Sequence, residues 1–416
     1  MALTVGIDLC DDYTTICVWG GSGVTMIPTI VCRGREEQNT EESREADGAR
    51  WYIGEEAYRK ALAGGGVLTD KLLKLLKKDG TSTIYGRTYT AAELLAAFLR
   101  RVLALSEKQA GEIQSLSIAL HTADRELMDK VREVAVSIGL RREAVHLLSH
   151  QEAFIYYALQ QDKELYSNLV ELFDLSDERL CCYELKVMRG LSRNTVVAEG
   201  RDLEEAFQIG ILKTDSGRKL ADRIMTGCAR RQMGKKIVSS VFLTGRGFES
   251  TEWAVEFKNF ICQRRRVLAE QGIFARGAAL HAADRLSPEN AIPYLMLCDT
   301  RTDYELSLPV VANNRPSQLI LAAAGESWYD YEAHVEVIPY GQNYVELELN
   351  PVDKFGAKRA LRLSMESFPK RPEKCTRVAL SVRLLDARHL RLSLRDEGFG
   401  ELFPKSGAEL SEEIEI

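Results

Sequence analysis

An order of strands and helices that occurs twice, within roughly the first 290 residues, constrains the fold of this chain more than any other feature. Each occurrence opens with neighbouring apolar, β-branched runs and continues with helical patterns that alternate with single strands. Such repetition predicts an α/β chain that contains one layered plan twice, at the level of pattern and not of residue identity. In the first occurrence, strands are expected at 3–9, 13–19, 24–31, 115–120 and 145–148.

The second occurrence begins near residue 169 and repeats the order with different residues. Its strands are expected at 169–174, 179–185 and 238–243. Charged helices are expected over 203–235, and a further helix over 252–270.

Capping residues mark where two helices of the first occurrence begin. Thr90 and Glu93 have the spacing of a capping box and predict a helix that starts at the next residue after Thr90. Asp124 can cap another helix, which Gly139 would end. A third helix is expected over 151–160.

Beyond Pro293 the pattern changes to short runs in which alternate residues are apolar. Seven such runs, separated by turn residues, predict an antiparallel β-sandwich. The runs are 304–311, 318–324, 333–339, 344–350, 359–365, 377–385 and 389–395. The acidic tail at 409–416 is expected to fray.

Composition excludes several classes of protein. The net charge of -6 gives no general attraction to nucleic acid or to anionic lipid. An uninterrupted apolar run of about 18 residues, which a membrane span needs, does not occur, and the first residues do not resemble a signal peptide. Nine cysteines without CxxC pairs favour a reducing, cytoplasmic setting.

Short segments resemble, in order along the chain, the actin-like ATPases, and specifically their seventy-kilodalton heat-shock chaperone branch. Val5-Gly6-Ile7-Asp8-Leu9 stands where that family opens its first phosphate loop, and Leu172-Phe173-Asp174-Leu175 resembles the second phosphate strand. Phe242-Leu243-Thr244-Gly245-Arg246-Gly247 resembles the adenosine strand and turn. Further similar segments are 26–31, 52–57, 89–99, 121–140, 150–153, 277–279 and 386–398.

The resemblance implies an α/β, two-lobed, duplicated actin-like ATPase fold with ribonuclease-H-like lobes, followed by a C-terminal antiparallel β-sandwich. It implies a first lobe over 1–165 and a reduced second lobe over 166–293. A sandwich similar to a chaperone peptide-binding domain would follow over 294–400, and then the acidic tail over 401–416. About 70 residues separate Asp174 from Gly245, which leaves little room for the subdomain that clasps adenine in that family.

The phosphate loops depart from the family pattern. Such loops need backbone N–H groups that converge on an anion, which glycine permits because it has no Cβ. Cys10-Asp11-Asp12 replaces the first glycine-containing loop, and Ser176-Asp177-Glu178-Arg179 replaces the second. The added carboxylates would face a triphosphate, and each like-charge pair ~4 Å apart costs about 4 kcal/mol at a dielectric near 20.

The candidate cleft positions are those that survive or replace the family's residues: Asp8, Asp11, Asp12, Asp174, Gly245, Arg246 and Gly247. If Mg-ATP is bound, the resemblance implies that Asp8 and Asp174 orient the metal-bound water. Structural roles are favoured over the metal role, because an aspartate often caps a turn and a glycine pair can serve a tight strand-to-helix turn. No catalytic residue is assigned.

Other residues were weighed against ordinary structural roles. His150 stands where the family has a glutamate, and an interface role is favoured over catalysis. His146 and His150 have helical metal-ligand spacing but flank a strand-like run. The run 264–266 is interpreted as a solvated helix face. Cys10, Cys17, Cys181 and Cys182 are expected to be buried thiols on central strands.

Three functions remain open. The favoured one is a non-catalytic, chaperone-like scaffold with a degenerate nucleotide cleft that binds a protein or peptide partner, without nucleic acid or membrane. The second is a divergent Mg-ATP-binding ATPase. The third is an adaptor of the bacterial division or pilus-assembly kind. Loss of both glycine loops favours the scaffold, because phosphoryl transfer depends on positioned electrostatic groups.

Overall fold

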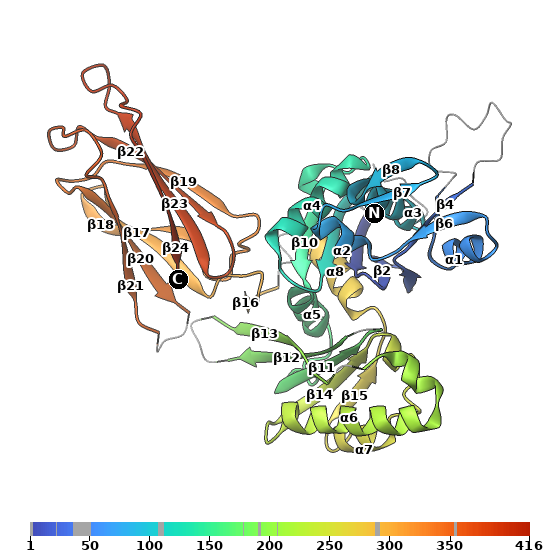
Figure 1. Ribbon diagram of the computed structural model, residues 1–416. Helices are drawn as coiled ribbons and strands as arrows, with labels where there is room; N and C mark the ends of the chain where they lie inside the picture. The colour runs from blue at the N-terminus through green and yellow to red at the C-terminus, as the bar shows by residue number, and fades with distance from the viewer. Residues whose placement is uncertain are drawn as a thin grey trace. The chain divides into compact units, whose positions relative to one another are not determined.

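The computed structural model divides the chain into two compact units, Met1–Tyr294 and Leu295–Ile416 (Figure 1). It describes residues 3–21, 23–35, 51–106, 112–177, 179–189, 193–205, 207–287, 292–352 and 356–416. The lobes predicted over 1–165 and 166–293 both lie in the first unit. Most of the polar segment at 34–50 lies outside the described residues.

The first sheet of unit 1 has the strand order β10-β9-β1-β2-β3. Strand β1 pairs in parallel with β9, which pairs in parallel with β10, whereas β2 and β3 are antiparallel. The strands are β1 (Leu3–Leu9), β2 (Tyr13–Val18), β3 (Val24–Pro28), β9 (Ile113–Leu120) and β10 (Val145–Ser149). Each strand expected from the first sequence pattern is therefore present.

Five consecutive strands of a six-stranded second sheet repeat this arrangement in the order β15-β14-β11-β12-β13. Its central strand β11 is parallel to β14 and antiparallel to β12, as β1 is to β9 and β2. The strands are β11 (Leu169–Leu175), β12 (Leu180–Met188), β13 (Thr195–Asp202), β14 (Val238–Thr244) and β15 (Arg266–Ala269).

The prediction was wrong in part between residues 195 and 270. Strand β13 was missed because its second half is charged and glycine-containing, and the helix expected from 203 begins only at Asp215. The helix expected over 252–270 ends at Ile261. Arg264 then adopts a positive φ of 60°, so the 264–266 run is a turn that enters β15 and not a helix face.

The helices of unit 1 follow their capping signals. The side chain of Thr90 accepts the N–H of Glu93 in a complete capping box, and Asp124 accepts the N–H of Leu127, so both predicted starts are confirmed. The helices are α1 (Gly54–Leu62), α2 (Leu72–Lys77), α3 (Ala91–Ala104), α4 (Arg125–Ser137), α5 (His150–Leu159), α6 (Asp215–Met233), α7 (Val255–Ile261) and α8 (Ile273–Asp284). Short 3-10 turns lie at Arg142–Ala144, Ile209–Lys213 and Arg246–Phe248.

Helices α5 and α8 lie between the two sheets (Figure 1). Helix α8 packs on β1 and β9, whereas α5 packs on α8 and on β13. Eight of the ten residues of α5 are buried, as expected for a helix covered on opposite faces. Gly277 permits the close crossing, because a Cβ there would lie 1.9 Å from the carbonyl oxygen of Ala153.

The remaining elements of unit 1 form two small sheets near α1 and α3. Strands β4, β5 and β6 form one sheet in the order β5-β4-β6, and β7 and β8 form a hairpin. Their bounds are β4 (Val31–Gly34), β5 (Trp51–Ile53), β6 (Gly66–Thr69), β7 (Thr81–Ile84) and β8 (Arg87–Thr90). Within the described residues of the chain, none of the helices has the length and apolar character needed to cross a bilayer.

Unit 2 contains two four-stranded antiparallel sheets, β18-β17-β20-β21 and β19-β22-β23-β24, and a short strand β16 (Leu295–Leu297). Alternate residues of β20, β22 and β23 are buried, so each sheet has a solvent face and a core face. All seven predicted runs are strands. Their bounds are β17 (Tyr304–Ala312), β18 (Arg315–Ala322), β19 (Glu332–Val337), β20 (Tyr344–Pro351), β21 (Arg359–Ser364), β22 (Arg377–Leu384) and β23 (His389–Gly398).

The prediction that the acidic tail frays was wrong. Residues Glu409–Glu415 form strand β24, which pairs with β23 along its whole length. Arg391 of β23 binds Glu413 directly across the pair. The tail's acidic side chains are therefore balanced by the basic strand beside it.

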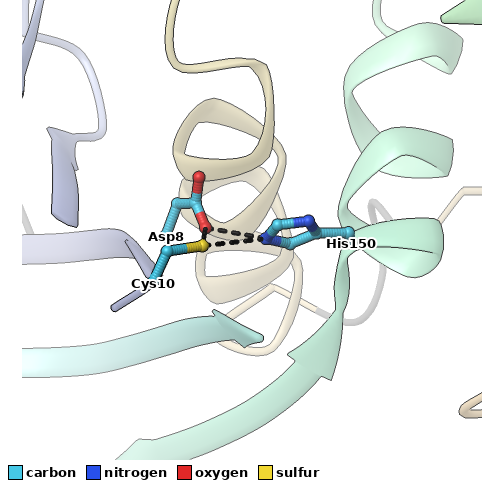
Figure 2. Close-up of side chains that lie close together, drawn as sticks. All are labelled: Asp8, Cys10 and His150. Carbon is cyan, nitrogen blue, oxygen red and sulfur yellow. Dashed lines mark hydrogen bonds and ion pairs between the residues drawn. The ribbon is translucent and has the colours of Figure 1, made fainter. Parts of the chain in front are cut away.

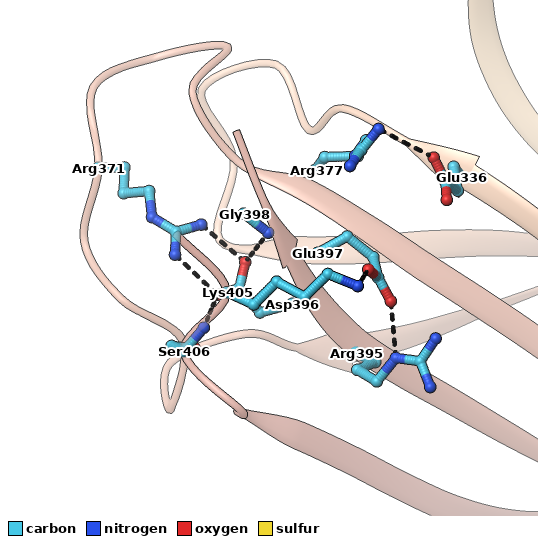
Figure 3. Close-up of polar contacts among 9 residues, drawn as sticks. All are labelled: Glu336, Arg371, Arg377, Arg395, Asp396, Glu397, Gly398, Lys405 and Ser406. Atoms are coloured by element: carbon cyan, nitrogen blue, oxygen red, sulfur yellow. Dashed lines mark hydrogen bonds and ion pairs between the residues drawn. The ribbon is translucent and has the colours of Figure 1, made fainter. Parts of the chain in front are cut away.

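A buried ion pair holds the end of β23 against its flanking loops (Figure 3). The two terminal nitrogens of the Arg371 guanidinium each donate to one oxygen of the Asp396 carboxylate at 2.7 Å. The two side chains are only 6% and 0% exposed. The backbone N–H groups of Gly398 and Ser406 donate to the same carboxylate. These bonds, chiefly those from Arg371, hold the pKa of Asp396 well below its usual range.

We expect Arg371→Ala to destabilise unit 2 by about 3–5 kcal/mol, because it leaves a buried carboxylate without its cation. The matched control is Arg391→Ala, which removes the exposed pair with Glu413 and should cost less than about 1 kcal/mol. Hydrogen exchange at the β22 and β23 amides of the full chain measures both values. Equal effects of the two substitutions would contradict this assignment.

Candidate functional site

The ends of β1, β11 and β14 and the starts of α5 and α8 surround one small cavity in unit 1. Asp8 is the penultimate residue of β1, and Asp174 is the penultimate residue of β11, so the two sheets present equivalent carboxylates to it. The volume is about 50 Å³, which is room for a few water molecules or an ion.

Three side chains of different chemistry converge at this cavity (Figure 2). The Nε2 atom of His150, at the start of α5, lies 2.7 Å from Oδ1 of Asp8 and 3.9 Å from Sγ of Cys10. The Cys10 sulfur lies 3.5 Å from the same Asp8 oxygen. Because these atoms face one another, the group could hold a metal ion.

The His150 ring is held in place on its other sides. It stacks on Phe274 of α8 with 3.8 Å between ring centroids, and its Nδ1 atom lies 3.2 Å from the Tyr183 hydroxyl. That hydroxyl lies 3.3 Å from Nδ1 of His121. The imidazole therefore has one defined orientation, with Nε2 directed at Asp8 and Cys10.

A second group of possible ligands lies at the far end of this contact chain. Nε2 of His121 lies 3.1 Å from the Asp202 carboxylate, and the Cys181 sulfur lies 2.8 Å from the same carboxylate. These three residues also place one ligand atom each within reach of a common point. Tyr183 thus connects two clusters of metal-ligating side chains.

Burial dominates the electrostatics of the cavity. It raises the pKa of Asp174 to about 6, although the Arg179 guanidinium acts in the opposite direction. Burial, with the Asp8 carboxylate second, raises the pKa of the Cys10 thiol well above its usual range. Burial and the neighbouring His150 lower the pKa of His121 to about 4, so that ring is neutral at pH 7.

Five of the seven sequence-predicted positions line the cavity, namely Asp8, Asp12, Asp174, Gly245 and Arg246. Asp11 and Gly247 do not line it. The Asp11 carboxylate instead accepts the N–H groups of residues 73 and 74 in the first turn of α2.

The second predicted loop is held by an internal ion pair. Arg246 donates to both carboxylate oxygens of Asp177 and lies over the Tyr13 ring at 4.3 Å. Gly245 has a φ of +88°, and a Cβ there would lie 2.4 Å from Oδ1 of Asp174, so only glycine fits. Glu178 lies outside the described residues.

The thiol prediction requires one correction. Cys17, Cys181 and Cys182 are buried on strands, but Cys10 is partly exposed and lies in the turn after β1. The strand ends at Leu9 because the chain turns there through two aspartates. This places the Cys10 sulfur in the cavity and not in the sheet core.

Sequence reasoning gave too little weight to His150 and did not single out Arg179 or Tyr183. A signal existed for His150, which begins a helix directly after a strand. Nothing in the sequence indicates that Arg179 and Tyr183 face His150, because that proximity depends on the packing of α5 and α8 against β12. His146 packs beside His281, so the predicted pair of His146 and His150 has separate environments.

Comparison with known proteins identifies the family. Residues 12–299 match the family described as "Family of unknown function (DUF5716) C-terminal", and this match covers more than half of the chain. The chain belongs to the DUF5716 family. Residues 301–416 of this DUF5716 chain match a domain of unknown function, DUF8552.

The other comparisons add little to this identification. No curated protein matches the chain. Among solved structures, a non-polymerising mutant of MamK bound to AMPPNP is similar at 14% identity, over 68% of this chain and 98% of that chain. Its TM-score is 0.42, so the fold of the DUF5716 chain has to be argued from its own strands.

The raised pKa of Asp174 predicts a defined pH dependence of stability. Because the folded state keeps this proton up to about pH 6, whereas the unfolded chain loses it near pH 4, stability decreases as the pH rises through that interval. We expect Asp174→Asn to remove this decrease and to be more stable than the wild type by about 2–3 kcal/mol at pH 7.

Denaturant titrations between pH 4 and pH 8 give the difference in the free energy of unfolding. The matched control is Asp162→Asn, which changes an exposed carboxylate of the same unit and should show no such dependence. A difference between Asp174→Asn and the wild type that stays constant across this range would refute the assignment.

Proposed function

We propose that this protein is a non-catalytic, chaperone-like scaffold with an actin-like first unit, a nucleotide cleft closed by its own side chains, and a protein or peptide partner. The observation that carries the proposal is the small cavity, about 50 Å³, at the position of the expected cleft. Small-molecule pockets are commonly about 300–1,000 Å³.

The actin-like part of the proposal rests on the two sheets of unit 1. They share strand order and strand directions, and Asp8 and Asp174 occupy equivalent positions in them. Assignment to the heat-shock branch rests on the sequence resemblance and on the antiparallel sheets of unit 2. We propose a cytoplasmic location because nine cysteines without CxxC pairs favour a reducing compartment.

Internal contacts support the proposal that Mg-ATP does not fit the residues present. Asp177 is paired with Arg246, Asp11 is bonded to the start of α2, and the N–H of Ser176 donates to the carbonyl of Arg179, so these contacts occupy parts of both loops. The Oδ1 atom of Asp8 is already 2.7 Å from Nε2 of His150. The divergent ATPase of the sequence analysis would have to break these contacts.

For the partner, we propose the hairpin formed by β17 and β18. Strand β18 is an edge strand, and Val311 and Ile320 are 73% and 54% exposed. Its unpaired backbone groups and apolar side chains are the features used by sheets that bind an extended peptide as an additional strand. Asn313 and Asn314 form the hairpin turn with positive φ angles.

We expect calorimetry of the full chain with Mg-ATP to detect no binding stronger than a dissociation constant of about 1 mM, which is about -4 kcal/mol. The reason is the ion pair between Asp177 and Arg246 and the volume of only about 50 Å³ between Asp8 and Asp174. A larger hollow beside it, about 470 Å³, contains only Asp11 and Asp12 of the predicted cleft positions. Asp177→Gly should increase affinity relative to the control Asp162→Asn. Micromolar binding by the wild type that Asp8→Ala abolishes would overturn the scaffold proposal in favour of the ATPase.

We expect Ile320→Asp to reduce the amount of partner recovered with the full chain at least tenfold, because burial of an isoleucine contributes about 1.5–3 kcal/mol. The matched control is Ser317→Asp, which adds the same charge to the same exposed strand. Quantitative affinity capture from the producing cells compares both with the wild type. Equal recovery with the two variants would exclude this hairpin as the binding surface.

A further inference from the structure

The ligand atoms of Asp8, Cys10 and His150 are spaced nearly as three of the four ligands of a tetrahedral metal site would be. Tetrahedral zinc with bonds of about 2.0–2.3 Å separates an oxygen from a nitrogen ligand by about 3.3 Å, and sulfur from either by about 3.5 Å. The three observed separations are 2.7, 3.9 and 3.5 Å. Shifts of about 0.6 Å or less would therefore suffice for coordination.

Hydrogen bonding on the far side of His150 determines which ring nitrogen carries the proton. An ionised carboxylate only accepts, so Nε2 of His121 donates to Asp202. With the proton of His121 on Nε2, its Nδ1 atom accepts from the Tyr183 hydroxyl. The Tyr183 oxygen in turn accepts from Nδ1–H of His150.

This order of donors leaves Nε2 as the His150 nitrogen that is directed at Asp8 and Cys10. It faces the Oδ1 atom of Asp8 at 2.7 Å and a thiol whose S–H is directed at the same oxygen. Either an additional proton or a cation has to lie between them. A proton serves only two of the three atoms, whereas a metal ion bonds to all three.

We propose that Asp8, Cys10 and His150 bind a zinc ion, with the fourth coordination position directed into the cavity. Nitrogen, oxygen and sulfur ligands together are typical of zinc, and the carboxylate and thiolate balance its charge. Tyr183 is the hydrogen-bond acceptor that a metal-bound histidine needs at its other nitrogen. The ion would fasten the end of β1 to the start of α5, and this role does not depend on the proposed scaffold function.

The second cluster is less suited to the ion. Nε2 of His121 donates to Asp202 in the chain of hydrogen bonds, and the Cys181 thiol also donates to that carboxylate. These bonds already satisfy Asp202. We therefore assign His121 and Asp202 to orienting Tyr183, not to holding metal.

Binding replaces protons. The S–H bond of Cys10 breaks, a sulfur–zinc bond forms, the proton passes to solvent, and no atom changes oxidation state. The proton between Nε2 of His150 and Oδ1 of Asp8 also passes to solvent, so the apparent affinity should increase with pH. The charged and titratable groups that face the thiol are Asp8, Asp12, Asp174, His150 and Arg179.

The test uses Co²⁺ as a spectroscopic substitute for zinc in the metal-stripped, reduced full chain. We expect one equivalent to bind with a thiolate-to-cobalt absorption band that Zn²⁺ displaces. Cys10→Ser should abolish the band, and Tyr183→Phe should weaken binding by about 10–100-fold although it removes no ligand. Circular dichroism of each metal-free variant verifies that it is folded.

The controls are two other cysteines. Cys262→Ser changes an exposed thiol, and Cys181→Ser changes the thiol of the second cluster. Both should retain the band and the affinity within about threefold. The proposal is overturned if the wild type gives no band, if the band survives Cys10→Ser, or if it is lost in Cys181→Ser but not in Cys10→Ser.

Discussion

The close crossing of α5 and α8 determines how far the His150 ring lies from Phe274 and from Asp8. Gly277 allows α8 to approach the backbone of Ala153, and the same two helices carry Phe274 and His150, whose rings stack at 3.8 Å. Because His150 is the first residue of α5, any larger side chain at 277 would move this imidazole away from Asp8. A contact between backbones therefore controls a polar site one to two helical turns away.

The sequence allowed most strands to be predicted because their signals are local. Runs such as 3–9 and 169–174 are mostly apolar, as is typical of strands covered on both faces. Strand β13 escaped prediction since its second half carries glutamate, arginine and aspartate, which mask the pattern. The short β15 begins with an arginine and was included in an expected helix. The end strand β24 escaped because four of its seven residues are glutamates, which do not indicate a strand on their own.

Only those site residues that end a strand could be predicted from the sequence. Asp8 and Asp174 could be selected because each ends an apolar run, and both line the cavity. The relation of Cys10 to His150 spans 140 residues and is created by packing between β1, α5 and α8. The protonation order that runs through Tyr183 and His121 likewise depends on burial, which lowers the pKa of His121, and burial cannot be read from a single residue's neighbours in the chain.

The edges of the sheets in unit 2 differ in character. Strands β19, β21 and β24 expose charged side chains along their lengths, whereas the outer half of β18 exposes leucine and isoleucine. Charged edges resist the addition of further strands. If two copies of this protein joined through β18, each would bury that edge, and among the described strands of the two sheets in unit 2 the charged edges would remain. Such association would stop at a closed pair and would not propagate into a fibre.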